Sequence, residues 1–240
     1  QREEHPEWKA IVGCKPHPVR LKWTHPDVAT AIADTIIARL DKNPDTISVS
    51  LSPGDGIGWD EEMDPKFDTG DWDDAAQVIS KTDRLLILCN RICSKVTQKH
   101  PRVIFGMLAY VDYTMPPLRE NVHPKLIPQI APITYNRAHP MTTENHPNGF
   151  TVRDLVKGWG KITPGGFSAY WYTYNLAEVS APNPFITKYS TDLPILFDNN
   201  CQFWQPETMA NFETVMPALV LGMRLSWDKR LKPSDVIEDL

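Results

Sequence analysis

The stretch Thr46-Ile-Ser-Val-Ser-Leu-Ser-Pro-Gly-Asp-Gly-Ile-Gly-Trp-Asp-Glu-Glu62 is the part of the chain that decides the fold. Its first half alternates apolar residues with serine, and this period of two predicts a strand over residues 47–52. Pro53 and three glycines then end the strand in a tight loop, because glycine tolerates the positive φ that such loops require. Acidic and aromatic residues follow. A strand whose carboxyl end leads into carboxylates and a tryptophan is typical of (β/α)-barrel active sites.

Further strands and helices alternate along the rest of the chain. Apolar runs predict four more strands, over residues 103–111, 126–133, 167–174 and 201–205. Helical periodicity predicts helices from Pro26 to about Asn43 and over residues 82–99, 152–162 and 208–227, and a helix or turn near 188–199. Five strands that alternate with helices or long connections predict parallel βα units. We therefore expect an α/β fold, a TIM-barrel-like (β/α) domain over residues 1–240, incomplete because about five βα units are too few for eight strands.

Three local expectations follow from the same patterns. The proline-rich residues 1–23 read as an irregular lead-in. Thr24 is placed to cap the first helix, and Ser80 with Asp83 occupies capping-box positions at the second. Residues 53–79 read as a long acidic loop, either functional or a solvated insertion.

Composition excludes several functions. The chain has 240 residues, 41% of them hydrophobic, and a net charge of −5 with mixed signs, which argues against a nucleic-acid partner. No apolar run is long enough for a membrane span. All seven histidines precede proline, so none forms the helical i, i+4 pair of a zinc site, and we expect neither metal nor cofactor. The chain opens on Gln1 without a signal peptide, which indicates a processed or excised sequence.

The four cysteines indicate little about compartment. Cys89 and Cys93 share one face of a predicted helix and are interpreted as small apolar core residues. Cys14 and Cys201 are far apart in the sequence, and a disulfide between them stays an open alternative.

Carboxylates among aromatic residues at the predicted strand ends favour carbohydrate recognition, since a sugar ring stacks on tryptophan or tyrosine while acids bind its hydroxyls. Glycoside hydrolysis needs a carboxylic acid and a second group that acts as base, nucleophile or orienter. The catalytic candidates are Glu61, Glu207 and Asp60. The substrate-binding candidates are Asp55, Trp59, Tyr110, Asp112, Arg137, His139, Trp171, Tyr174 and Trp204.

Several of these candidate residues also have a simpler structural interpretation. Asp55 between glycines can close an Asx turn. Glu207 can be a first-turn acid of the last helix. His139 can serve only to hydrogen-bond its own loop, and one face of the strand that carries Trp171 and Tyr174 is plain core.

Several motifs resemble the family called domain of unknown function 4838, within which glycoside hydrolase family 163 was defined. The resemblance covers nearly the whole chain in the same order. It rests on Ser52-Pro-Gly-Asp-Gly-Ile-Gly-Trp59, Lys81-Thr-Asp-Arg-Leu85 with Asn90, Leu108-Ala-Tyr110 followed by Pro116-Pro117, and Trp204-Gln-Pro-Glu207. In two places the chain departs from the family pattern. Asp60-Glu-Glu62 stands where many relatives carry Cys-x-Cys, and the last-strand acid is displaced to Glu207.

The resemblance implies a secreted bacterial protein with a glycosidase-like barrel, placed in the extracellular space or the periplasm. It implies a β-N-acetylglucosaminidase acting on an oligosaccharide or glycan, with the acetamido group of the substrate as a plausible nucleophile. Two alternatives stay open: a non-catalytic carbohydrate-binding protein on a degenerate barrel, and a barrel fragment without a complete site.

Overall fold

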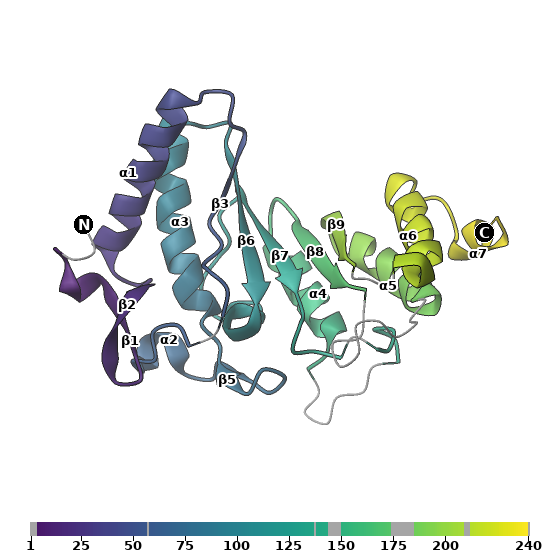
Figure 1. The fold of residues 1–240 in the computed structure, drawn as a ribbon, viewed down its shortest axis with the longest axis horizontal. Coiled ribbons are helices and arrows are strands. Elements are labelled where there is room, and N and C mark those ends of the chain that lie inside the picture. The colour runs from purple at the N-terminus through teal and green to yellow at the C-terminus, as the bar shows by residue number, and fades with distance from the viewer. Residues whose placement is uncertain are drawn as a thin grey trace. The chain divides into compact units, whose positions relative to one another are not determined.

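A computed structural model describes residues 4–56, 58–136, 138–143, 150–173, 185–208 and 212–239. Its largest sheet has five strands in the order β3-β6-β7-β8-β9 (Figure 1). The strands are β3 (Ser48–Ser50), β6 (Ile104–Tyr110), β7 (Leu126–Ala131), β8 (Phe167–Tyr172) and β9 (Cys201–Glu207). The order follows the chain without reversing, which is the winding of a (β/α) barrel and differs from that of a doubly wound sheet. The expected α/β class and all five predicted strands are confirmed.

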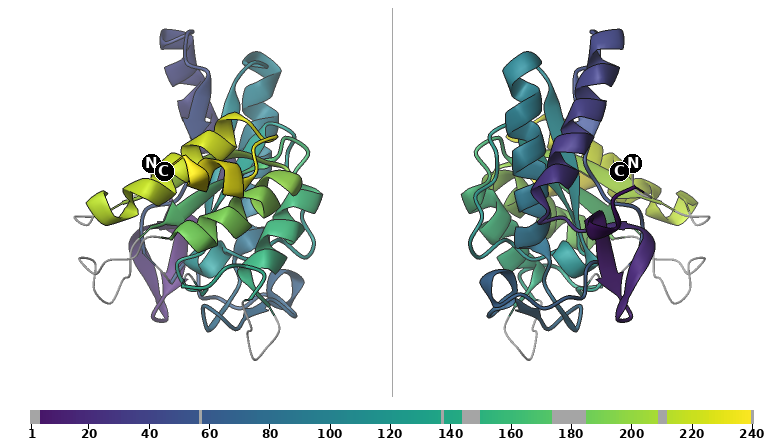
Figure 2. Two further views of the ribbon diagram at one scale, coloured as in Figure 1. Left: turned by 90° about the vertical axis from the view of Figure 1, so that its right-hand side faces the viewer. Right: turned by 90° about the vertical axis from the view of Figure 1, so that its left-hand side faces the viewer.

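The four predicted helices are also present, and the helix or turn predicted near residues 188–199 is a helix. The five are α1 (Pro26–Lys42), α3 (Thr82–Lys99), α4 (Val152–Ile162), α5 (Ile186–Asp198) and α6 (Phe212–Trp227). A short helix, α7 (Pro233–Glu238), follows them and was not predicted. Figures 1 and 2 show α1 and α3 side by side.

The expectation that residues 1–23 are irregular is wrong. A 3-10 turn, η1 (Pro6–Trp8), leads into an antiparallel hairpin of β1 (Lys9–Val12) and β2 (Lys15–Leu21). Gly13 and Cys14 connect the two strands, each with φ +59°, as a two-residue hairpin turn requires. The prolines of β2 hide this strand in the sequence, but an edge strand tolerates them because one side needs no ladder hydrogen bonds.

Both helix caps also differ from the prediction. His25, not Thr24, is the N-cap of α1, and its Nδ1 accepts a hydrogen bond from the Asp27 N–H at 3.3 Å. At α3 the N-cap position is held by Lys81, without a side-chain cap. Imidazole was overlooked as a cap because serine, threonine, asparagine and aspartate are the usual choices.

The structure divides into two compact units. Unit 1 comprises residues 1–128 with 162–165, and unit 2 comprises residues 129–161 with 166–240. In unit 1, α1 and α3 cover one face of β3 and β6, where Phe105 and Met107 are buried. In unit 2, α5 and α6 cover the face of β9 that carries Trp204, whose ring lies edge-on to Tyr189 at 5.3 Å. The opposite face of these strands is partly exposed, and in a barrel such a face lines the interior.

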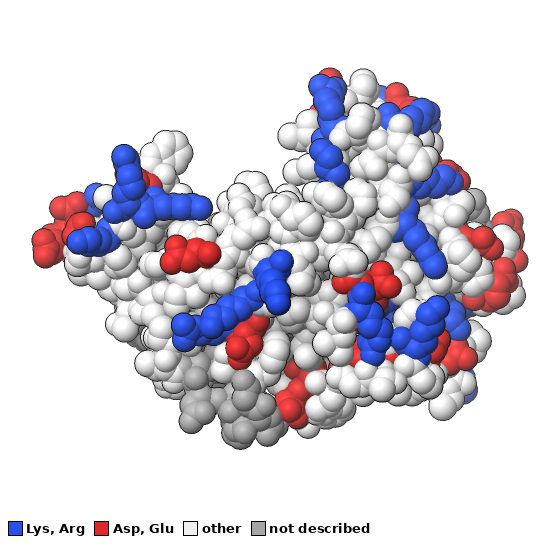
Figure 3. Space-filling model, turned by 180° about the vertical axis from the view of Figure 1, so that it is seen from behind, with Lys and Arg blue, Asp and Glu red and all other residues white. Residues whose placement is uncertain are grey.

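The surface mixes charges of both signs. On the face drawn in Figure 3, lysine and arginine side chains are interspersed with aspartate and glutamate. Among the helices of the described ranges, none has the length and apolarity needed to cross a membrane.

Candidate functional site

The loop after β3 is anchored to the end of β6. The Leu51 N–H donates to the Gly106 carbonyl at 2.7 Å, and the Ser52 hydroxyl accepts from the Leu108 N–H at 3.0 Å. Gly56 and Gly58 adopt φ +110° and +76°, so the predicted need for glycine is confirmed at both. The chain then forms a short helix, α2 (Pro65–Asp68), and a two-stranded ribbon of β4 (Trp72–Asp73) and β5 (Val78–Ile79). The part of the loop after Gly58 therefore carries secondary structure of its own.

Asp112 is the best-placed polar group of unit 1. It follows β6 directly and is only 5% exposed. Its Oδ2 accepts a hydrogen bond from the Gly58 N–H at 2.9 Å, which ties the β3 loop to the end of β6. Its Oδ1 is buried and has no hydrogen-bond partner within the described residues. Since a buried polar atom without a partner costs about 1–3 kcal/mol, such an atom calls for a functional explanation.

Two more predicted binding residues lie near Asp112. Burial raises the pKa of the Tyr113 hydroxyl, and Asp112, Tyr110 and Asp55 raise it further through their charge, which places all three within electrostatic reach of that hydroxyl. Asp55 also accepts a hydrogen bond from the Gly56 N–H at 2.7 Å, so it helps to close the loop as the simpler reading expected. Asp55, Tyr110 and Asp112 thus all act electrostatically on Tyr113.

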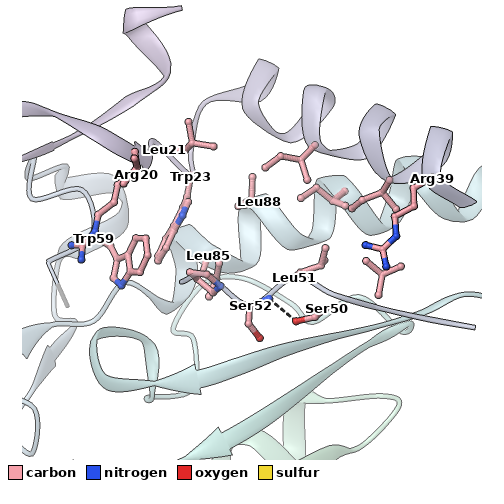
Figure 4. Close-up of a pocket in the computed structure, with 16 residues that line it drawn as sticks. Arg20, Leu21, Trp23, Arg39, Ser50, Leu51, Ser52, Trp59, Leu85 and Leu88 are labelled. Carbon is pink, nitrogen blue, oxygen red and sulfur yellow. Dashed lines mark hydrogen bonds between the residues drawn. The ribbon is translucent and has the colours of Figure 1, made fainter. Parts of the chain in front are cut away.

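Trp59 does not form an open sugar platform. Its ring is 7% exposed, stacks on Trp23 with 5.2 Å between centroids, and lies 4.4 Å from the Arg20 guanidinium (Figure 4). Its Nε1 donates to the Gly56 carbonyl at 3.2 Å. Arg20 belongs to β2 of the hairpin. Because residues 1–23 were expected to be irregular, the packing of Arg20 on Trp59 was not predicted. The prediction that a sugar ring stacks on Trp59 therefore needs correction, because this ring packs between the loop after β3 and the hairpin.

A cavity of about 340 Å³ lies beside this stack. Apolar side chains of α1, α3 and β3 line most of it, including Ile32, Ile36, Val49 and Leu88 (Figure 4). The cavity is on the helix-covered face of β3.

Asp60 and Glu61 hold the hairpin in place. Asp60 is 1% exposed, and its Oδ1 accepts from the Ile11 N–H at 3.2 Å. Glu61 accepts from the Gly13 N–H at 2.7 Å, and its own N–H donates to the Ile11 carbonyl at 2.7 Å. Two of the three carboxylates predicted to be catalytic are thus engaged in structural contacts.

Arg84 is the centre of a buried ion network. Its Nη1 lies 2.9 Å from Asp60 Oδ2, and its Nε and Nη2 bind both carboxylate oxygens of Asp68. Its Nη2 also donates to the Glu62 carbonyl at 2.7 Å. Burial acts to raise the pKa of Asp68, but hydrogen bonds from Arg84 and the Asp64 N–H outweigh it and hold the pKa below its ordinary value. One arginine therefore fixes three points of the segment from Asp60 to Asp68.

Asp83 binds a neighbouring loop rather than capping its own helix. Its carboxylate accepts hydrogen bonds from three consecutive N–H groups, those of residues 118–120, at 2.7–2.9 Å. Arg119 in turn makes a bidentate ion pair with the buried Asp71, with Nη1 to Oδ2 at 2.8 Å. The Lys81–Leu85 motif thus fastens two loops to α3. Sequence reasoning noticed the motif but did not predict this role.

Glu207 lies at the carboxyl end of β9, in unit 2. It is in register with Tyr172 of β8, and its carboxylate accepts a hydrogen bond from the Tyr170 hydroxyl. Burial raises the pKa of Tyr170, and the charge of Glu207 raises it further, so the hydroxyl stays protonated and able to donate. The alternative that Glu207 is a first-turn acid of α6 is wrong, because it belongs to β9 and α6 begins at Phe212.

Polar side chains surround this pair on the partly exposed face of the sheet. The Gln129 side-chain amide of β7 donates to the Ser168 hydroxyl at 2.9 Å and to the Gln205 side-chain oxygen at 3.2 Å. Amides, hydroxyls and a carboxylate therefore line the strand ends of unit 2. None of the three amide and hydroxyl residues was among the predicted site residues, although Gln205 precedes Glu207 by two positions and so shares its face.

The remaining predicted residues lie elsewhere. Trp171 and Trp204 are on the helix-covered face: Trp171 is 2% exposed, and a Cβ at Gly222 of α6 would lie 2.4 Å from the Trp204 ring. The stacking predicted for them needs correction, because the strand alternation turns both rings into the core. His139 pairs with Asn136 at 3.1 Å within its own loop, as the simpler reading expected. Arg137 and Tyr174 lie outside the described residues.

A buried ion pair of α5 was not predicted. Lys188 Nζ lies 2.7 Å from Asp192 Oδ2, and it also donates to the His139 carbonyl at 2.7 Å. The Met141 N–H donates to Asp192 Oδ1 at 2.8 Å. These contacts fix the segment after β7 to α5. The i, i+4 spacing in the sequence was a signal for the pair.

Comparisons with known proteins identify the family and show a distant fold likeness. A family model described as "Domain of unknown function (DUF4838)" matches residues 1–240. An α-galactosidase of glycoside hydrolase family 36, AgaA from Geobacillus stearothermophilus, in complex with stachyose, is 13% identical, with a TM-score of 0.43 over 94% of this chain and 29% of that one. Its raffinose complex gives 11% identity and a TM-score of 0.41 over the same shares. This chain thus spans under a third of that enzyme. No curated protein matches it.

Proposed function

We propose, from the premise that this chain belongs to the DUF4838 family over its full length, that it is a glycoside hydrolase acting on N-acetylglucosamine-containing glycans. The substrates would be oligosaccharides of the extracellular space or the periplasm. The observation that carries the proposal is the Glu207–Tyr170 pair at the carboxyl ends of β9 and β8.

Glu207 is the proposed acid/base carboxylate. Protonated, it transfers its proton to the glycosidic oxygen as the bond to the leaving group breaks, while the acetamido oxygen of the substrate attacks the anomeric carbon. Water then opens the cyclic intermediate and returns a proton to Glu207. The Tyr170 hydroxyl holds the carboxylate in one orientation, and positioning of this kind is what makes proton transfer effective. The amide and hydroxyl groups of Gln129, Ser168 and Gln205 supply donors and acceptors for sugar hydroxyls.

Asp112 is the proposed sugar-binding carboxylate of unit 1. Gly58 fixes one oxygen and leaves Oδ1 without a partner among the described residues, so a substrate hydroxyl or acetamido N–H can donate to it. A donor there would remove the cost of the unpaired oxygen. Trp59 and the Arg84 network act indirectly, because they hold the loop that carries Gly58.

Hydrolysis of a chromogenic N-acetylglucosaminide by matched variants tests the proposal. We expect Glu207→Gln to lower kcat by about 10²–10⁴-fold, the usual contribution of an acid/base group. Tyr170→Phe should give a smaller loss, and the control Glu61→Gln should retain activity. Unchanged turnover in Glu207→Gln would refute the catalytic assignment.

The same variants address the carbohydrate-binding alternative. A degenerate barrel predicts that the wild type binds the sugar in calorimetry but does not hydrolyse it. The proposed enzyme predicts that Glu207→Gln retains binding while turnover is lost.

A further inference from the structure

Helix α6 carries a second apolar face that unit 2 does not use. Its inner side chains, among them Val215, Leu221 and Leu225, are buried. A surface helix normally opposes one apolar face with a polar one. On the outer side of α6, however, Met223 is 57% exposed and Trp227 is 93% exposed. The outer stripe consists of Phe212, Met216, Val220, Met223 and Trp227.

The spacing of the outer stripe fits another helix. Successive members are four, four, three and four residues apart, so all five lie on one face of the helix. The C-terminal helix α7 does not fill the stripe. It packs through the buried Val236 and through the ion pair of Asp239 with Arg224, at 2.7 Å.

We propose that the outer stripe pairs with the same stripe of a second copy of this chain, with the two α6 helices antiparallel about a two-fold axis beside Val220. The stripe reads nearly the same in both directions from this axis. Reversal about a point between Leu219 and Val220 sets Phe212 against Trp227 of the partner and Met216 against Met223, and it leaves the two Val220 residues next to the axis. An isologous interface requires this self-complementarity.

Charges at the ends of α6 favour the antiparallel arrangement. Glu213 is exposed beside the stripe in the first turn, whereas Lys229 and Arg230 are exposed just beyond the last turn. Antiparallel pairing brings the acid of one copy to the bases of the other and opposes the two helix dipoles. Parallel pairing would set Glu213 against itself. The two apolar faces of α6 thus have separate tasks, one within unit 2 and one between copies.

Sedimentation velocity over a concentration series tests the proposal on the whole chain. We expect the wild type to dimerise reversibly with rising concentration and Trp227→Glu to stay monomeric. Because Trp227 is exposed, its replacement should leave the thermal unfolding curve unchanged at the lowest concentrations, where the wild type is also monomeric. Glu213→Lys should weaken the dimer, and adding Lys229→Glu with Arg230→Glu should restore it. A wild type that is monomeric throughout, or a dimer indifferent to Trp227→Glu, would overturn the proposal.

Cysteine cross-linking tests the position of the axis without a disruptive charge. In a Cys14→Ser background, which removes the exposed native thiol, Val220→Cys should form a disulfide-linked dimer under mild oxidation. The matched control Ser226→Cys lies on the same helix but to one side of the stripe, and it should not cross-link. Equal cross-linking at the two positions would contradict the two-fold axis beside Val220.

Discussion

Replacing Arg84 should destabilise unit 1 strongly. The guanidinium is 2% exposed, and its partners Asp60 and Asp68 have side-chain exposures of 2% and 0%. Arg84→Met would remove the guanidinium that neutralises two buried carboxylates and binds the Glu62 carbonyl, and it would leave only two backbone N–H groups and Lys81, 3.5 Å from Asp68, beside the carboxylates. Breaking a buried ion pair from one side costs about 3–5 kcal/mol, because the remaining charge stays buried without compensation. At roughly 2–4 °C per kcal/mol for a chain of this size, the Tm should fall by roughly 6–20 °C.

Thermal unfolding followed by tryptophan fluorescence is the assay, since Trp23 and Trp59 of unit 1 stack on each other. Arg84→Lys should be intermediate, because one ammonium group cannot replace a planar donor that serves two carboxylates and a carbonyl. The partly exposed Lys95 pairs with Asp34 at the surface and serves as the control. Lys95→Met should leave the Tm unchanged. An Arg84→Met variant as stable as the wild type would refute the anchoring role of this network.

Three further predictions concern thiols, acid stability and packing. Ellman's reagent should modify one thiol per native chain, the exposed Cys14, and all four after unfolding, since burial raises the pKa of the other three; a second fast-reacting thiol would contradict this. The pKa of Asp68 in the folded state lies below its unfolded value of 3.8, so its stabilisation is present above that pH and is lost as the pH falls through the folded pKa. Asp68→Asn should therefore lose less stability than the wild type between neutral pH and acid, measured by urea unfolding; an equal loss would remove Asp68 from the acid response. Gly160→Ala should destabilise by about 1–3 kcal/mol, because the new Cβ would lie 2.1 Å from the Asn199 carbonyl oxygen, whereas Gly54→Ala meets nothing within 4 Å; equal unfolding midpoints would contradict the packing.

The periodic elements could be predicted because each is decided by local pattern. The helix α3 begins and ends where its apolar stripe and His100-Pro101 indicate, and β6 follows its apolar run. The strand order then follows from the alternation of strands and helices. The hairpin of residues 9–21 was not predicted, because its prolines argued against a strand more strongly than Gly13 and Cys14 indicated a two-residue turn.

The candidate site could be predicted only in part, because sequence position shows which residues follow a strand but not what packs on them. Asp112 and Glu207 were found since both stand at strand ends. Trp59 was predicted to bind substrate and Asp60 to be catalytic, although they contact the hairpin and Arg84, partners 24 or more residues away. Such contacts are tertiary, and no local pattern in the sequence signals them.

Turnover of an N-acetylglucosaminide by the wild type and by Glu207→Gln, measured at saturating substrate with binding verified in parallel, tests the central claim most directly. We predict that the wild type hydrolyses the glycoside and that Glu207→Gln binds it with its kcat reduced by about 10²-fold or more. Equal turnover in the two proteins, or binding without hydrolysis in the wild type, would contradict the claim.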